Sequence, residues 1–481
     1  MKIAKRRLSL TALWNAENGY RHVLRIAFPL VISTGSWSIK LFVDRMFLTW
    51  YSPEALAASM PAGMLNVALM SLFTGTAGYT STFVAQYFGA GRHTRIGPSV
   101  WQGFYISLLG AMLMLALIPL ASPFFAFVGH DPAVQENEVV YFRILCLGAF
   151  PAIGNAAASG FFAGRGRTWP VMWANIFGAL VNTGLDYVLI FGYLGLSALG
   201  IRGAAIATVA SASLQFALYL ALIAGGGHNT AFHTIKGWRM DVPLLRRLLR
   251  YGFPNGIQFF VDMMGFAVFI LLMGRLGTIP LAASNLAFNV NTLAFMPMIG
   301  VGIAVSVLVG QSLGRDRPDL ASRSVMSGLH LALLYMGTIA CLYAFTPDIF
   351  LKPFALNADK ESFQAIRAIA VIALRYVAAY SLFDALAIVY SSALKGAGDT
   401  RYTMWVMTAA IIFALVLPTY VAIVLLQADL FVGWTIVTAY VGLVAIAFLF
   451  RYLGGKWKQM RVIESRPNTI PPTPIKQHGT D

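Results

Sequence analysis

The chain contains 481 residues, of which 58% are hydrophobic and only 11% charged, and its mean hydropathy is +0.70. This composition excludes a soluble protein of several domains and indicates a polytopic membrane protein. The formal net charge is +16. We do not expect a nucleic-acid partner, because the basic residues gather beside apolar segments, where they set membrane orientation.

Apolar runs long enough to cross a bilayer recur along the whole chain. A helix needs about 20 such residues to span roughly 30 Å of hydrocarbon. On this basis we predict an all-α membrane protein with twelve transmembrane helices. Their approximate ranges, in chain order, are 22–48, 56–86, 99–121, 139–163, 169–192, 203–225, 250–275, 281–311, 324–345, 368–394, 402–425 and 430–453.

The first six and the last six predicted helices repeat one sequence pattern. Pro29 corresponds to Pro254 and Gln86 to Gln311, with no net gap between the two anchors. Duplicated halves of this kind are common in secondary transporters, whose substrate and ion sites lie near the interface of the repeats and the midplane of the bilayer. Further identical pairs are Phe28 and Phe253, Asn66 and Asn291, Gly75 and Gly300, and Gly89 and Gly314.

The duplication predicts an N-lobe over residues 1–228 and a C-lobe over residues 229–462. Residues 463–481 are rich in proline and poor in apolar side chains, so we expect a disordered cytoplasmic tail there. Most Lys and Arg residues lie at the two ends of the chain and in alternate loops, and this asymmetry places both termini in the cytoplasm. The opposite loops contain only Arg143, Arg202, Arg275, Lys352, Lys360 and Arg367.

Four acidic residues lie deep within the predicted helices: Asp44, Asp186, Asp262 and Asp384. A charge at the centre of a membrane helix costs about 2.5–3.5 kcal/mol, so an acid in this position is a functional hypothesis by default. None of the four has an acidic counterpart in the other half of the chain. The scaffold is therefore duplicated while the charges are not.

The N-lobe set of candidate site residues comprises Asp44, Asn182, Asp186 and Thr208. Asn182 and Asp186 are spaced i, i+4 and share one helix face, while Thr208 and Asp44 add oxygens from two other helices. Such hard oxygen donors suit Na⁺, and two neighbouring carboxylates could equally share a proton. Either ion can therefore be the coupling ion.

The C-lobe set of candidate site residues comprises Gln258, Asp262, Tyr380 and Asp384. Gln258 and Asp262 are spaced i, i+4, as are Tyr380 and Asp384, so each pair shares a helix face. The set could bind a cationic substrate by charge and by an aromatic face, or it could form a second ion site.

A purely structural role is the alternative for each of the four acids. Asp44 follows Lys40 by one helical turn and directly precedes Arg45, so an ion pair on the same helix would neutralise it. Asp262 has no basic residue within one turn of its own helix.

No catalytic motif occurs in the sequence. It contains no glycine-rich phosphate loop with a lysine, no His-Glu-x-x-His and no Gly-x-Ser-x-Gly. We therefore expect a protein that is not an enzyme, that has no cofactor and no metal beyond possible Na⁺, and that draws its energy from a gradient.

A series of motifs, in order and spacing, resembles the multidrug and toxic compound extrusion (MATE) family over about residues 20–455. The motifs are Phe28-Pro29 followed by Phe42-Val43-Asp44, the segments 84–91 and 164–170, Asn182-x-x-x-Asp186, Phe253-Pro254 with Asp262, and the segments 296–314 and 395–400.

The resemblance implies two six-helix lobes around a V-shaped central cavity. The sequence has no obvious helix-dimer motif, so we expect a monomer, and we expect it in the lipid bilayer of the bacterial inner membrane. The resemblance also implies export of organic cations or amphiphilic compounds in exchange for Na⁺ or H⁺. Some members use the positions of the N-lobe set as cation ligands, and others use those of the C-lobe set; this chain keeps both. It departs from the family at Lys40 and Arg45. A flippase or exporter of lipid-linked or polysaccharide precursors is the alternative.

Overall fold

The structure is a computed structural model that describes residues 14–225, 227–355 and 360–464. The described residues form helices and connecting turns and contain no β-strand, which confirms the predicted all-α class. In the first half the main helices are α2 (Tyr20–Tyr51), α3 (Pro53–Gly78), α4 (Thr80–Gly89), α5 (Ile96–Ala116), α6 (Ala121–Val128), α7 (Pro132–Leu147), α8 (Ala149–Gly164), α9 (Trp169–Phe191) and α10 (Ile201–Ala224).

The short α11 (His228–Phe232) lies in the connection between the halves. The second half contains α12 (Val242–Met273), α13 (Thr278–Gly314), α14 (Pro318–Phe345), α15 (Asp348–Ala355), α16 (Lys360–Ala397), α17 (Thr400–Ala410), the π-helical segments Ile411–Val416 and Val421–Leu425 on either side of α18 (Leu417–Tyr420), and α19 (Leu430–Leu453).

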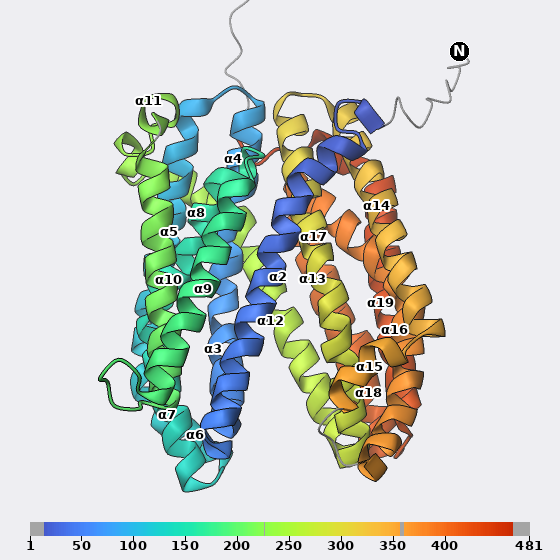
Figure 1. Cartoon of the computed structure of the whole chain (residues 1–481). Helices are drawn as coiled ribbons and strands as arrows, with labels where there is room; N and C mark the ends of the chain where they lie inside the picture. Colours follow the sequence, from blue (N-terminus) through green and yellow to red (C-terminus); the bar gives the residue numbers. More distant parts are fainter. Residues whose placement is uncertain (1–13, 226, 356–359, 465–481) are drawn as a thin grey trace, which may run out of the picture.

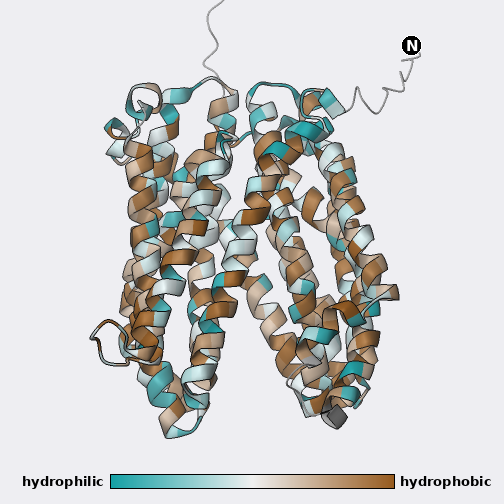
Figure 2. Ribbon diagram, viewed as in Figure 1, coloured by the Kyte–Doolittle hydropathy of each residue, from teal (hydrophilic) through white to brown (hydrophobic). Residues whose placement is uncertain are grey.

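The number of membrane-spanning helices agrees with the prediction. Eleven helices in the described part of the chain are long and apolar enough to span a bilayer, and the bent pair α7 and α8 can supply a twelfth. Figure 2 shows apolar residues along the length of the helices and polar residues gathered toward their two ends.

Two of the spans are irregular for identifiable reasons. The α7–α8 pair bends by 47° around Gly148, where the side chain of Val209 packs so closely that no Cβ would fit. The π-helical segments flank Pro418, whose ring and missing N–H disrupt the regular pattern of helical hydrogen bonds.

The helices form two lobes, each with its own hydrophobic core. In Figure 1 the lobes lie close together at the end of the molecule where the N-terminus is marked and diverge toward the opposite end. Helices α2 and α12 occupy equivalent positions in the repeat and both cross between the lobes. Near its start α2 packs on α13 and α14 and further along on α9, whereas α12 packs on α3 and α5 and then on α17.

The duplicated motifs make the contact between the lobes. Gln86 donates a hydrogen bond to the Gly396 carbonyl (3.0 Å), and Gln311 donates one to the Gly164 carbonyl (2.8 Å). Gly89 packs against the backbone of Gln311, and its counterpart Gly314 packs against the backbone of Gln86. A Cβ at either glycine would overlap the facing carbonyl, so only glycine permits this approach.

The C-terminal segment after α19 also joins the interface, and it includes Ile463 and Glu464, the first two residues of the predicted tail. Val462 is 1% exposed, and its N–H donates to Gln86 Oε1 (2.8 Å). Glu464 forms ion pairs with arginines of both lobes. The remainder of the predicted tail, 465–481, lies outside the described residues.

Candidate ion and substrate site

The N-lobe set is assembled mainly by α2 and α9, which pack against each other. Asp186 and Asn182 are completely buried and Asp44 is 7% exposed. Both carboxylate oxygens of Asp186, Asp44 Oδ1 and both polar side-chain atoms of Asn182 lack a hydrogen-bond partner among the described residues. Because an unsatisfied buried oxygen is costly, this arrangement fits a site that is completed by a bound cation or proton.

Lys40 faces these acids but does not form the ion pair considered above. Its Nζ donates to Ser211 Oγ (3.2 Å), and its charge acts on both Asp44 and Asp186. The described residues contain no direct ion pair between Lys40 and either acid, and Arg45 is exposed. Lys40 therefore offsets part of the negative charge without occupying the carboxylate oxygens.

Thr208 is linked to this cluster only through its backbone. Ser211 Oγ, the acceptor for Lys40, itself donates to the Thr208 carbonyl (3.0 Å) on α10. The Thr208 side chain is half-buried, and within the described chain no hydrogen bond joins its hydroxyl to the carboxylates. The structure thus brings Asp44, Asn182 and Asp186 together and leaves Thr208 at the edge of the cluster.

The C-lobe set lies on α12 and α16. Asp262 and Asp384 are half-buried, and their carboxylates interact electrostatically. Tyr380 is 3% exposed, and its hydroxyl accepts a hydrogen bond from Asn291 Nδ2 (3.3 Å). Gln258 is buried, and its Oε1 has no partner among the described residues. Asp262, Asp384 and Tyr380 form one cluster, and no hydrogen bond joins the Gln258 side chain to it within the described part of the chain.

Sequence reasoning missed two residues of the C-lobe cluster. Lys395 acts electrostatically on Asp262, and the buried Tyr440 hydroxyl of α19 interacts with both acids. The predicted helix ends at residue 394, which leaves Lys395 in the following loop. In the structure α16 continues to Ala397 and includes Lys395. Its spacing of i, i+11 from Asp384 is three helical turns, and this spacing places both on one helix face.

Glu138 is a buried acid outside the two sets. Its side chain is completely buried, its Oε1 lies 2.7 Å from His130 Nδ1, and its Oε2 has no hydrogen-bond partner among the described residues. Among the described residues, no group of three or more His, Cys, Asp or Glu side chains forms a metal site. Asp186 differs from Glu138 because neither of its carboxylate oxygens has a hydrogen-bond partner among the described residues.

Comparison with known families agrees with the two-lobe arrangement. The MatE family model matches residues 29–188 and 254–420, one block in each lobe. The chain belongs to the MatE family. This result confirms the resemblance identified from the sequence motifs and assigns the chain to a family of multi-pass membrane transporters.

Curated relatives cover most of this MatE protein. It is 28% identical to a probable multidrug resistance protein NorM of Bradyrhizobium diazoefficiens over 88% of this chain and 92% of that protein. It is 30% identical to the multidrug resistance protein PmpM of Pseudomonas aeruginosa over 83% of this chain and 82% of that protein.

Solved structures share the fold. A MOP superfamily transporter from Pyrococcus furiosus superposes with a TM-score of 0.82 at 20% identity, covering 93% of this chain and 98% of that one. The predicted pair of six-helix lobes is thus confirmed at the level of the fold.

Proposed function

We propose that this protein is a multidrug efflux antiporter that exports organic cations or other amphiphilic compounds in exchange for Na⁺ or H⁺. The observation that carries the proposal is the pair of buried carboxylates, Asp44 and Asp186. Both oxygens of Asp186 and Oδ1 of Asp44 lack partners within the described part of the chain. The multidrug resistance names of the relatives from Bradyrhizobium and Pseudomonas support the substrate class.

In this proposal the N-lobe set binds the coupling ion. A proton or Na⁺ between Asp44 and Asp186 neutralises charge that Lys40 offsets in part, and this changes the packing of α2 on α9. Helix α2 carries the change to the other lobe, because Thr34 Oγ1 donates to the Met296 carbonyl of α13 (2.9 Å). Pro29 interrupts the hydrogen bonds of α2 and supplies a point at which it can bend.

In the proposed transport cycle, the C-lobe set binds the exported compound. Asp262 and Asp384 supply negative charge, which suits an organic cation, and the buried side chains of Tyr380 and Tyr440 lie beside these acids. Ion binding in one lobe and cargo binding in the other then favour different arrangements of the two lobes, as exchange requires.

We place the joined end of the lobes in the cytoplasm and the protein in a bacterial inner membrane. This orientation is supported by the basic residues at the joined end, among them Arg92, Arg95 and Arg247. With the lobes joined there and divergent at the opposite end, the described conformation faces outward in this proposal.

The test is efflux of a fluorescent organic cation, ethidium, in proteoliposomes with Na⁺ and pH gradients imposed separately. We expect one gradient to drive flux, and Asp44→Asn and Asp186→Asn each to reduce it at least about tenfold, as loss of an essential ion ligand would. Glu136→Gln is the matched control, because its carboxylate is 77% exposed. Undiminished gradient-driven flux in both Asp variants would contradict the proposal.

A further inference from the structure

A basic pocket lies at the joined end of the lobes, apart from the acidic sets. It has a volume of about 520 Å³ between the start of α12 and the C-terminal segment, and its polar lining comprises Arg246, Arg247, Arg250, Arg461 and Glu464. Four cations therefore surround one acid. Nothing in the transport proposal uses this pocket.

Two of its arginines already have acidic partners. Arg247 forms an ion pair with Glu464, and Arg461 Nη2 lies 3.2 Å from Asp316 Oδ1. Arg246 and Arg250 are exposed and form no ion pair with any residue that the structure describes. Because they are spaced i, i+4, these two charges stand on one face of α12 at the mouth of the pocket.

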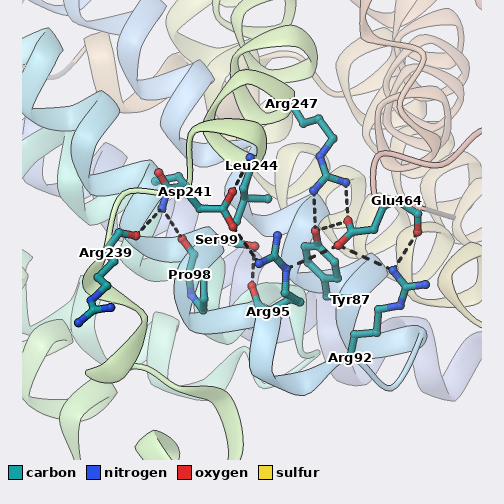
Figure 3. Close-up of polar contacts among 11 residues, drawn as sticks. Tyr87, Arg92, Arg95, Pro98, Ser99, Arg239, Asp241, Leu244, Arg247 and Glu464 are labelled. Carbon is teal, nitrogen blue, oxygen red and sulfur yellow. Dashed lines mark hydrogen bonds and ion pairs between the residues drawn. The ribbon is translucent and has the colours of Figure 1, made fainter. Parts of the chain in front are cut away.

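On one side of the pocket, arginines already bind the carboxylate of a residue of this chain, Glu464. Figure 3 shows the Glu464 carboxylate within a ring formed by Arg247, Arg92, Arg95 and the Tyr87 hydroxyl, which donates to Oε2 at 2.7 Å. This geometry shows that the arginines here can converge on carboxylate oxygens. The ring leaves Arg246 and Arg250 available to a second anion.

The surroundings of the pocket suit an amphiphile. Val242 lines the pocket and is 62% exposed, and the adjoining Trp238 and Met240 are 58% and 57% exposed. Exposed tryptophan beside arginine is typical of the level where lipid headgroups meet the acyl chains. An anion with an apolar tail would place its charge at the arginines and its tail along these side chains.

We propose that this pocket binds the phosphate group of an anionic phospholipid, with Arg246 and Arg250 as its main ligands. The recognised chemistry is a phosphate oxyanion, which a lipid headgroup or free phosphate could present; the exposed apolar residues beside the pocket favour the lipid. Basic pockets at the cytoplasmic ends of membrane helices are suited to anionic headgroups.

The experiment measures thermal unfolding of the purified full-length protein in detergent with increasing dioctanoyl-phosphatidylglycerol, dioctanoyl-phosphatidylcholine or inorganic phosphate. We expect phosphatidylglycerol to raise Tm, and the Arg246→Gln/Arg250→Gln variant to need at least about tenfold more of it for the same shift. Arg21→Gln/Arg25→Gln is the matched control, because these arginines are also exposed, spaced i, i+4, and on α2 at the same end of the molecule.

Three results would overturn the proposal. An equal loss in the Arg21/Arg25 control would show that general surface charge attracts the lipid. Phosphatidylcholine acting as strongly as phosphatidylglycerol would show that the headgroup charge is not recognised. Inorganic phosphate acting at the same concentration as phosphatidylglycerol would show that the ligand is free phosphate. Retention of most of the shift in Arg246→Lys/Arg250→Lys would support a charge-based site, and a monodisperse size-exclusion profile would show that the variants are folded.

Discussion

Gln86 and Gln311 are equivalent residues of the two repeats, and each donates a hydrogen bond to a glycine carbonyl of the opposite lobe. The two bonds are therefore a symmetric pair that fastens one end of the molecule. Among the described residues, Gln86 makes an added contact that Gln311 lacks, because Gln86 Oε1 accepts the N–H of Val462. The segment after α19 therefore makes the contacts of the two glutamines unequal.

Removing the two glutamines should affect stability unequally. Gln311→Ala should lower the free energy of unfolding by about 1–3 kcal/mol, because it leaves a buried carbonyl without its donor. Gln86→Ala should lower it further, because it also leaves the Val462 N–H unpaired. Chemical unfolding in detergent would measure both values, and equal losses would show that the Val462 contact contributes little.

The close approach of the lobes at Gly89 should not tolerate a side chain. Gly89→Ala would place a Cβ against the Gln311 carbonyl and should reduce Tm by several degrees, since overpacking of this kind typically costs about 1–3 kcal/mol. Gly442→Ala on α19 is the control, because no atom lies within 4 Å of the added Cβ. A Tm for Gly89→Ala equal to that of the control would mean that the interface can relax around a methyl group.

Lys40 should weaken binding of the coupling ion. Its ammonium acts on Asp44 and Asp186, so a bound cation must overcome its repulsion. Lys40→Gln should therefore lower the half-saturating concentration of Na⁺ or H⁺ in proteoliposome flux about tenfold. Arg45→Gln, an exposed neighbour, should change it little. A higher half-saturating concentration in Lys40→Gln would instead make Lys40 a support for the site.

The ion pairs of Glu464 should persist in moderately acidic solution. Burial alone would raise the pKa of Glu464, but hydrogen bonds from Arg247 and Tyr87 outweigh it and lower the pKa from 4.5 to about 2. A lowered acid pKa stabilises the folded state above the unfolded value, and this contribution is lost as pH falls from about 4.5 toward 2.

The Tm difference between the wild type and Glu464→Gln should therefore be constant from pH 7 to pH 5 and should shrink only below about pH 4.5. The effect should be modest, because the side chain is 39% exposed and water screens its ion pairs. A difference that disappears already at pH 6 would contradict the assignment of these ion pairs to the folded state.

Much of the fold could be predicted because bilayer thickness fixes the length of an apolar helix and the repeat fixes the division into lobes. The bend at Gly148 could not, since the Val209 side chain that packs against Gly148 comes from another helix. The four acids could be predicted as candidate site residues because placing a carboxylate in the hydrocarbon layer costs free energy, and this argument needs no knowledge of the neighbouring residues. Tyr440 could not, because its approach to Asp262 depends on how α19 packs beside the other helices.

The contact between Val462 and Gln86 also sets an order for assembly. Val462 follows α19, so the ribosome releases it only after every described helix has been made. During synthesis the first lobe therefore exists before Gln86 Oε1 can accept the Val462 N–H, and this contact can form only after α19 has been made. The two residues are 376 positions apart in the sequence, so a contact of Gln86 depends on a residue that is synthesised much later.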